Sequence, residues 1–223
     1  NVYLHAWLVT GKPFFREIVE KTLDFLQREM RHEEGGFFAS MDADSEGEEG
    51  KYYVWTESQI RKVLDSDDLD PFISIYGVSA DGNFEGKNVL FLAQTPEELV
   101  AQSGLSAEEV LRRLNSARTT LLKERTARIP PITDDKVITA WNGLLLTAYA
   151  EAARALARSD YLETAQTLAE FFMESLLKDG SLYRTWREGQ ISHTAYLEDH
   201  AALGEGFLDL YQTDFDPRWF RAA

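Results

Sequence analysis

The stretch Thr133–Ala157, TDDKVITAWNGLLLTAYAEAARALA, has the longest helical pattern in the chain. Its polar residues recur every three to five positions, so they form one narrow stripe on an otherwise apolar helix. These residues are Thr139, Asn142, Thr147, Glu151, Arg154 and Arg158. Because a surface helix has a wide polar face, we expect other helices to enclose this one. A membrane span needs about 20 apolar residues, and the charges at Glu151 and Arg154 interrupt this run.

The composition is that of a globular protein. The chain has 223 residues, of which 44% are hydrophobic and 27% charged, and its net charge is -15. This acidity argues against nucleic-acid and anionic-membrane partners, because both need basic surfaces. The absence of cysteine excludes disulfides and thiolate metal sites. No signal-peptide pattern is visible, so we expect a cytoplasmic location.

Helix signals recur along the chain. Gly11 ends a first helix, and Pro13 suits the first turn of a second that extends to about Arg31. Aromatic or aromatic-aliphatic pairs open helices at Phe14, Tyr161 and Trp219, and the last two are 58 positions apart. This spacing fits a helical hairpin with its connection, and alternating inner and outer helices around a ring are the simplest interpretation.

Residues 1–223 are predicted to form one domain, with residues 32–130 as an insertion of loops, short strands and small helices. Within the insertion we expect a strand at Lys51–Trp55, a helix after the capping box Thr56-x-x-Gln59, and another helix opened by Asp70-Pro71. Two further strands, Leu182–Trp186 and Ile191–His193, are expected to pair as a hairpin.

An acidic loop, Asp42–Gly50, partly matches a calcium-binding loop through Asp42, Asp44 and Glu46. The twelfth position of such a loop needs glutamate but is Tyr53 here, so a solvated acidic turn is the favoured interpretation. A carboxylate pair that lines a cleft is the alternative, with Asp42 and Asp44 as substrate ligands.

Two acidic pairs lie at predicted helix starts. Asp134 and Asp135 open the central stretch, where one carboxylate suffices to cap the helix and the other is free to act as general acid, base or ligand. Glu198 and Asp199 open a later helix in the same way, followed by His200. A cap with an ordinary exposed histidine is one interpretation, and a proton carrier near neutral pH is the other.

Aromatic residues accompany these carboxylates. Trp55, Trp141 and Trp186 could offer ring faces to sugar C–H surfaces while the carboxylates take hydroxyls or donate protons. Asn142, on the polar stripe, is a further candidate ligand. The chain has no phosphate-binding loop, dinucleotide fingerprint, nucleophile elbow or histidine pair with metal-ligand spacing, so we predict no cofactor and no metal.

Three stretches together resemble a known family: Gly35–Trp55, Gly82–Leu90 and Asp134–Leu144. They are similar to the thioredoxin-domain-containing, spermatogenesis-associated protein 20-like family. This resemblance implies a mainly α fold, part of a six-hairpin (α/α) toroid like those of N-acylglucosamine 2-epimerases and six-hairpin glycosidases, with short β-hairpins in the loops. It also implies a thioredoxin-like domain elsewhere in the full-length protein. His200 departs from the aromatic residue expected after the Glu-Asp pair.

Two functions follow as hypotheses. The first is carbohydrate binding or processing, glycosidase-like or epimerase-like, in a cavity at the inner-helix N-termini, with Asp134, Asp135, Glu198 and Asp199 as catalytic groups. The second is a non-catalytic interaction module that serves the thioredoxin-like domain. Both chain ends fall beside or within helical patterns, so we expect a fragment of a longer protein whose apolar helix faces promote self-association.

Overall fold

The computed structural model describes all 223 residues, which divide into two compact units. Unit 1 comprises residues 1–40 and 133–223, and unit 2 comprises residues 41–132. The stretch interpreted as an insertion, residues 32–130, overlaps unit 2, and the assignment of residues 1–223 to one domain stays a prediction. None of the helices combines the length and apolarity that crossing a lipid bilayer requires.

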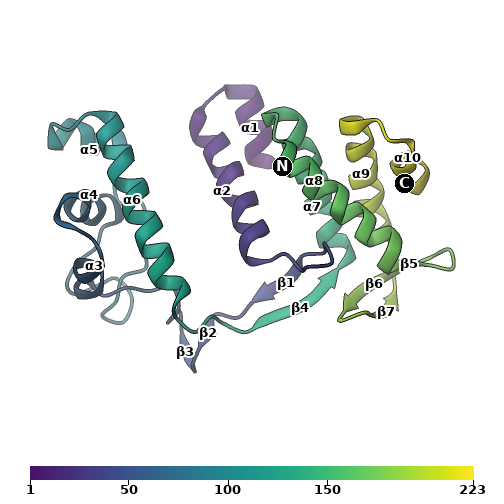
Figure 1. Cartoon of the computed structure of the whole chain (residues 1–223), viewed down its shortest axis with the longest axis horizontal. Helices are drawn as coiled ribbons and strands as arrows, with labels where there is room; N and C mark the ends of the chain where they lie inside the picture. The colour runs from purple at the N-terminus through teal and green to yellow at the C-terminus, as the bar shows by residue number, and fades with distance from the viewer. The chain divides into compact units, whose positions relative to one another are not determined.

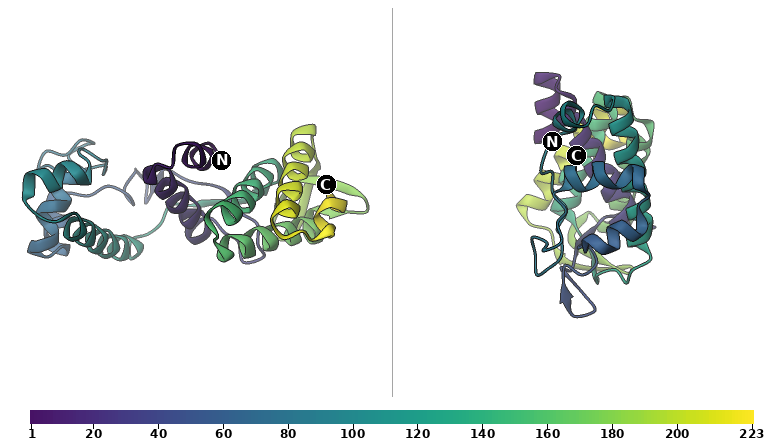
Figure 2. Two further views of the ribbon diagram at one scale, coloured as in Figure 1. Left: turned by 90° about the horizontal axis from the view of Figure 1, so that it is seen from above. Right: turned by 90° about the vertical axis from the view of Figure 1, so that its left-hand side faces the viewer.

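The helices of unit 1 lie in two rows (Figure 1). The first row is α1 (Val2–Thr10), α7 (Thr139–Leu156) and α9 (Leu197–Asp214). The second row is α2 (Pro13–Glu29), α8 (Ser159–Phe171) and α10 (Pro217–Ala222). Side-chain contacts join neighbours: His5–Glu151 for α1 and α7, Tyr161–Asp24 for α8 and α2, and Arg218–Glu170 for α10 and α8. Each first-row helix is followed in the chain by its second-row partner, and Figure 2 shows the last such pair, α9 and α10, in yellow.

The contact between α7 and α9 is close because two glycines lie in it. A Cβ atom on Gly143 would lie 2.7 Å from the carbonyl carbon of Ala202, and one on Gly206 would lie 2.9 Å from the Gly143 oxygen. Eleven residues of α7 are buried, which confirms that other elements enclose most of this helix. One side remains open, since Trp141 and Leu144 are each 55% exposed.

The central helix begins later than the sequence pattern predicts. Residues Thr133–Ile138 form strand β4, and α7 starts at Thr139. The β-branched residues Val137 and Ile138 suit a strand, and they pair antiparallel with Trp186 and Thr185. Long-range pairing therefore overrides the helical pattern in this segment.

The strand β4 belongs to a five-stranded sheet. Its order is β1 (Phe38–Met41), β4, β6 (Ser181–Arg187) and β5 (Leu177–Lys178), with β7 (Gln190–Thr194) also paired to β6. The hairpin of β6 and β7 is the one predicted from the sequence. Glu188 and Gly189 both have positive φ at its turn, as a type I′ turn requires. A short π-helix, Phe172–Leu176, joins α8 to β5.

Unit 2 contains four helices and a small hairpin. These elements are β2 (Asp44–Ser45), β3 (Glu48–Glu49), α3 (Glu57–Val63), α4 (Ser66–Tyr76), α5 (Pro96–Ser103) and α6 (Ala107–Thr126). The helix α6 provides Ala117 and Leu121 to one apolar cluster, around Trp55 and Phe72, and Val110 and Leu114 to a second. Helix α6 therefore contributes to both apolar clusters of the unit and connects them.

Two local predictions in unit 2 are wrong. Lys51–Trp55 is not a strand: residues 51–53 turn, with the Tyr53 amide bonded to the Gly50 carbonyl at 2.8 Å, and Trp55 forms only an isolated bridge to Asn88. The helix α4 starts at Ser66 rather than at Pro71, because Asp65 accepts hydrogen bonds from two backbone amides and caps it earlier.

Candidate functional site

A single carboxylate joins the first turns of α7 and α9. The Asp199 side chain is completely buried, and its Oδ1 accepts a hydrogen bond of 2.9 Å from the Ala140 amide. Its Oδ2 accepts one of 2.8 Å from the Tyr196 amide. Helix starts leave such amides without partners, so Asp199 caps its own helix and the neighbouring one. The two helix starts therefore lie side by side.

Arg184 completes this network from strand β6. One terminal nitrogen lies 2.8 Å from Asp199 Oδ2 and 2.7 Å from Glu198 Oε1, and the guanidinium lies 4.7 Å from the centre of the Tyr196 ring. The Glu198 carboxylate is the main reason that the pKa of Arg184 is raised. The two carboxylates therefore share one nitrogen of Arg184. Only Glu198, whose side chain is 62% exposed, is accessible to a ligand.

Asp134 and Asp135 do not cap α7, contrary to the sequence-based interpretation. Both lie in β4, five and four residues before the helix begins. Asp135 forms an ion pair of 2.6 Å with Arg187, and Asp134 one of 3.1 Å with Lys136. The capping role belongs instead to Asp199, which is distant in sequence.

Asn142 and Trp186 are enclosed by the protein. The Asn142 side chain accepts a hydrogen bond from the Phe37 amide at 2.8 Å and donates one to the Phe37 carbonyl at 3.0 Å. Trp186 is 2% exposed and makes edge contacts with Phe171 and His32. Both side chains hold the sheet against the helices, and neither is open to a ligand.

Other predicted residues of unit 1 are open to solvent. Trp141 is 55% exposed, Tyr196 is 60% exposed with its ring at Arg184, and His200 is exposed on the first turn of α9. Trp141 also borders an apolar groove of about 490 Å³ between α1, α2 and α7. The groove is lined by Asn1, Val2, Tyr3, Leu4, Ile18, Val19, Thr22, Leu23, Leu26, Trp141, Leu144, Leu145 and Ala148.

Three predicted residues belong to unit 2. Asp42 and Asp44 are exposed, and Asp42 Oδ1 accepts a hydrogen bond of 3.2 Å from the Asp44 amide. The acidic loop folds as the β2–β3 hairpin, unlike the helix-flanked loop of a calcium-binding EF-hand. Trp55 is 3% exposed, with the Arg128 guanidinium 3.8 Å from its ring centre.

Sequence reasoning missed Arg184. Leu182 and Trp186 are the buried residues of β6, and Arg184 lies midway between them, on the same face by the two-residue period of a strand. A charge on a buried face needs a partner of opposite sign. That alternation, together with a downstream Glu-Asp pair, is the signal that could have identified this residue.

A second residue that the sequence does not reveal is the carboxylate Asp209, further along the α7–α9 contact. Partial burial is the main cause that raises the pKa of Asp209, and nearby Glu151 raises it further. Glu151 in turn lies 3.0 Å from His5 Nε2. These groups form a titratable cluster on three neighbouring helices.

The two rows of unit 1 define the class of the fold: it is mainly α and forms part of an (α/α) toroid. No protein-family model matches the chain. It is 30% identical to human spermatogenesis-associated protein 20 over 99% of its own length and 33% of the relative. For the mouse protein of the same name the identity is 29%, over 100% of this chain and 32% of the relative. The resemblance found in the sequence is thus confirmed, and the chain spans about a third of the length of these relatives.

Solved structures of sugar enzymes are loosely similar. A sugar epimerase from a ruminal bacterium has a TM-score of 0.37 and 15% identity, over 99% of this chain and 54% of that one. Cellobiose 2-epimerase from Bacillus thermoamylovorans has a TM-score of 0.38 and 13% identity, over 95% and 54% of the two chains. At these scores no site residue and no activity is transferred to this chain.

Proposed function

We propose that unit 1 binds a carbohydrate where α7 and α9 begin. The supporting observations are the Arg184–Glu198 ion pair with the exposed Tyr196 ring over Arg184, and the exposed Trp141 on the first turn of the adjacent helix α7. An aromatic ring offers an apolar face to sugar C–H groups, while charged groups at its edge bind hydroxyls. In this proposal Trp141 is the platform, Glu198 accepts hydroxyl hydrogen bonds and Arg184 donates them.

The remaining candidates have narrower roles in this proposal. In this proposal Asp134 and Asp135, on β4, accept hydrogen bonds from sugar hydroxyls, and His200 transfers protons. Asp42 and Asp44 belong to unit 2 and have no role in this proposal. Hydrolysis or epimerisation would use Glu198 as the acid, because Asp199 is buried and already accepts hydrogen bonds at both oxygens.

Isothermal titration calorimetry with a panel of neutral mono- and disaccharides tests this function. We expect millimolar or tighter binding of at least one sugar, and its loss in Trp141→Ala because the platform is removed. Phe220→Ala is the matched control, since Phe220 is 60% exposed on α10 and lies outside the site. Equal affinities of the Trp141→Ala variant and the unmodified chain would contradict the proposal.

The apolar groove favours a second function, an interaction module for the thioredoxin-like domain of the full-length protein. Its walls are almost entirely aliphatic or aromatic, and exposed apolar surface of this kind is typical of protein contacts. Leu144→Glu should then abolish capture of a separately expressed thioredoxin-like domain, and should reduce any self-association seen by light scattering. Sugar binding that Asp135→Asn abolishes would count against this alternative.

A further inference from the structure

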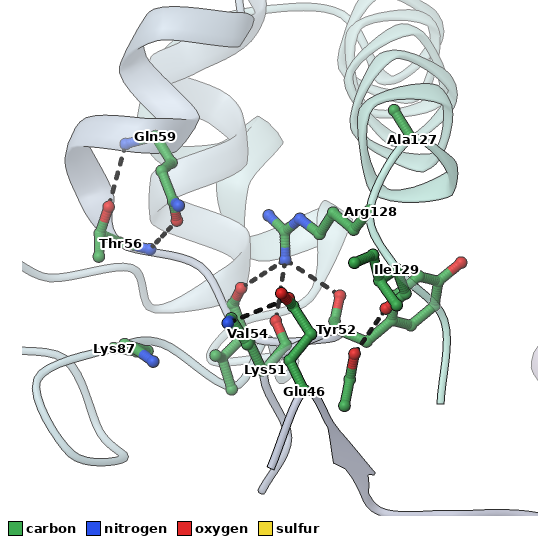
Figure 3. Close-up of a pocket in the computed structure, with 11 residues that line it drawn as sticks. Glu46, Lys51, Tyr52, Val54, Thr56, Gln59, Lys87, Ala127, Arg128 and Ile129 are labelled. Atoms are coloured by element: carbon green, nitrogen blue, oxygen red, sulfur yellow. Dashed lines mark hydrogen bonds and ion pairs between the residues drawn. The ribbon is translucent and has the colours of Figure 1, made fainter. Parts of the chain in front are cut away.

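Unit 2 contains a polar pocket of about 420 Å³ that the proposed sugar site does not include (Figure 3). It is lined by residues of the β2–β3 hairpin, the segment 51–59, Lys87 and the residues that follow α6. Two of the stretches that carry the family resemblance meet here, because Trp55 and Asn88 form a backbone bridge. The pocket volume is within the usual range of small-molecule sites, about 300–1,000 Å³.

Arg128 presents a fixed positive charge to this pocket. Its Nη1 donates to the carbonyls of Tyr52 at 3.0 Å and Val54 at 2.8 Å, and more weakly to that of Lys51 at 3.4 Å. The Cζ atom of the guanidinium also lies 3.8 Å from the centre of the Trp55 ring, within the range of a cation–π contact. These contacts hold one side of the guanidinium and leave the other side free.

The free side has no partner in the chain. Neither Nε nor Nη2 of Arg128 donates a hydrogen bond to the protein, and no carboxylate forms an ion pair with this residue. Figure 3 shows the second terminal nitrogen turned toward the side of the pocket where Thr56 and Gln59 lie. Partial burial lowers the pKa of Arg128, which means that its charge is incompletely solvated. A bound anion would compensate this charge.

The rest of the lining supports an anion. Lys51 and Lys87 add two ammonium groups, whereas Glu46 is the only carboxylate among the lining residues. Lys51 is paired with Glu46 at 3.0 Å, and Lys87 with Glu48, which lies outside the lining. All four of these side chains are about a third or more exposed, so these ion pairs are weak and can rearrange. The lining thus carries more positive than negative charge in a chain whose net charge is -15.

Gln59 adds a neutral donor. Its Oε1 is used in the capping box of α3, where it accepts from the Thr56 amide at 2.8 Å. This bond fixes the side chain and leaves the amide nitrogen without a partner in the chain. A planar guanidinium and an amide donor in the lining of one pocket can both donate to the oxygens of an oxyanion.

We propose that the pocket of unit 2 binds a small molecule through a carboxylate or phosphate group that pairs with Arg128, with Lys51 and Lys87 on either side. This site is independent of the carbohydrate site proposed for unit 1, because none of its lining residues belongs to unit 1. Either proposal can therefore fail without the other.

Nuclear magnetic resonance titration of the full chain tests the site with four probes: inorganic phosphate, succinate, glucose 6-phosphate and glucose. We expect saturable shifts of unit 2 amides with at least one anion, at a Kd of about 1 mM or below, and none with glucose. A response to phosphate and glucose 6-phosphate alone identifies a phosphate ligand, and a response to succinate alone identifies a carboxylate ligand.

Variants then locate the anion. Lys51→Gln and Lys87→Gln should each weaken binding about threefold to tenfold, and Arg128→Lys more than tenfold because the planar fork is lost. Lys123→Gln is the control, since this exposed lysine of α6 lies outside the pocket. Thermal unfolding shows whether Arg128→Lys remains folded. Absence of shifts with all three anions up to about 10 mM overturns the proposal, and so does unchanged affinity in both lysine variants.

Discussion

Asp199 in unit 1 is a fully buried charged group and Arg128 in unit 2 a partly buried one, and they differ in how many of their hydrogen-bonding atoms are used by the protein. Both oxygens of Asp199 accept from the protein, and its side chain has no exposed surface. Only one nitrogen of Arg128 donates to the protein. Removing a buried charge whose hydrogen bonds are all used leaves its partners unpaired and destabilises the fold, whereas a charge with unused donors at a pocket wall can bind a ligand.

The largest expected effect comes from removing the saturated charge. Asp199→Ala leaves the amides of Ala140 and Tyr196 and one side of Arg184 without partners in the interior. Such a loss costs about 3–5 kcal/mol, which lowers the midpoint of thermal unfolding by roughly 10 °C. Circular dichroism measures this change. Asp134→Ala is the control and should cost less than about 0.5 kcal/mol, because Asp134 is paired only with Lys136 at the surface. Similar midpoints for the two variants would refute the role given to Asp199.

The contact between α7 and α9 that Asp199 closes is also sensitive to volume. In Gly143→Ala the new methyl group would overlap the backbone of Ala202 and Leu203, and the expected cost is about 1–3 kcal/mol. Gly204→Ala on α9 is the matched control, since its nearest atom would be 3.7 Å away. There the better helix propensity of alanine should stabilise by about 0.5–1 kcal/mol. Chemical denaturation should therefore show a lower free energy of unfolding for Gly143→Ala and a higher one for Gly204→Ala. Changes in the same direction would mean that the helices do not touch at Gly143.

The cap of α3 in unit 2 comes from a residue of the same helix turn, unlike the cap that Asp199 provides to α7. Removing it is expected to have a smaller effect on stability. Thr56 accepts from the Gln59 amide at 3.2 Å within its own capping box. Thr56→Ala should therefore cost only about 1 kcal/mol, several times less than Asp199→Ala. A loss as large as that of Asp199→Ala would show that local and long-range caps are equivalent, contrary to the comparison.

This difference also decides what could be predicted from the sequence. The capping box at Thr56, the ending of α1 at Gly11 and the hairpin around Gly189 all follow from residues within a few positions of one another. Each of these predictions is confirmed. The enclosed helix and the alternation of helical pairs follow from periodicity, so the mainly α toroid class could be predicted as well.

Long-range partners could not be predicted. Nothing within the stretch Thr133–Ile138 indicates that it pairs with β6, and nothing near Ala140 indicates that a carboxylate 59 residues away caps α7. Asp134 and Asp135 were therefore assigned a role that Asp199 has. The same limitation applies to two other candidates. Asn142 suggests a ligand by its place on the polar stripe, and Trp186 by its aromatic ring. Their buried contacts, with Phe37 and Phe171 respectively, depend on the complete fold.

The smallest expected effect is a pH dependence of stability that comes from Asp209, a partly buried carboxylate. Partial burial and the nearby Glu151 raise the pKa of Asp209, so this residue favours the folded state when protonated and loses that contribution as the pH rises. Asp209→Asn should therefore raise the midpoint of thermal unfolding at pH 7 by roughly 1–2 °C, and this gain should vanish below about pH 4.

Asp216→Asn should change the unfolding midpoint in the opposite direction. The amide and side chain of Arg218 lower the pKa of Asp216. The ionised carboxylate therefore stabilises the fold at pH values above the ordinary pKa of an aspartate, and this contribution is lost as the pH falls. The variant should thus be slightly less stable than the unmodified protein at pH 7. Scanning calorimetry of both variants from pH 3 to 8 should give curves that diverge from the unmodified protein in opposite directions as the pH rises. A parallel response would mean that burial beside Glu151 does not control Asp209, and that the α7–α9 contact is more hydrated there than at Asp199.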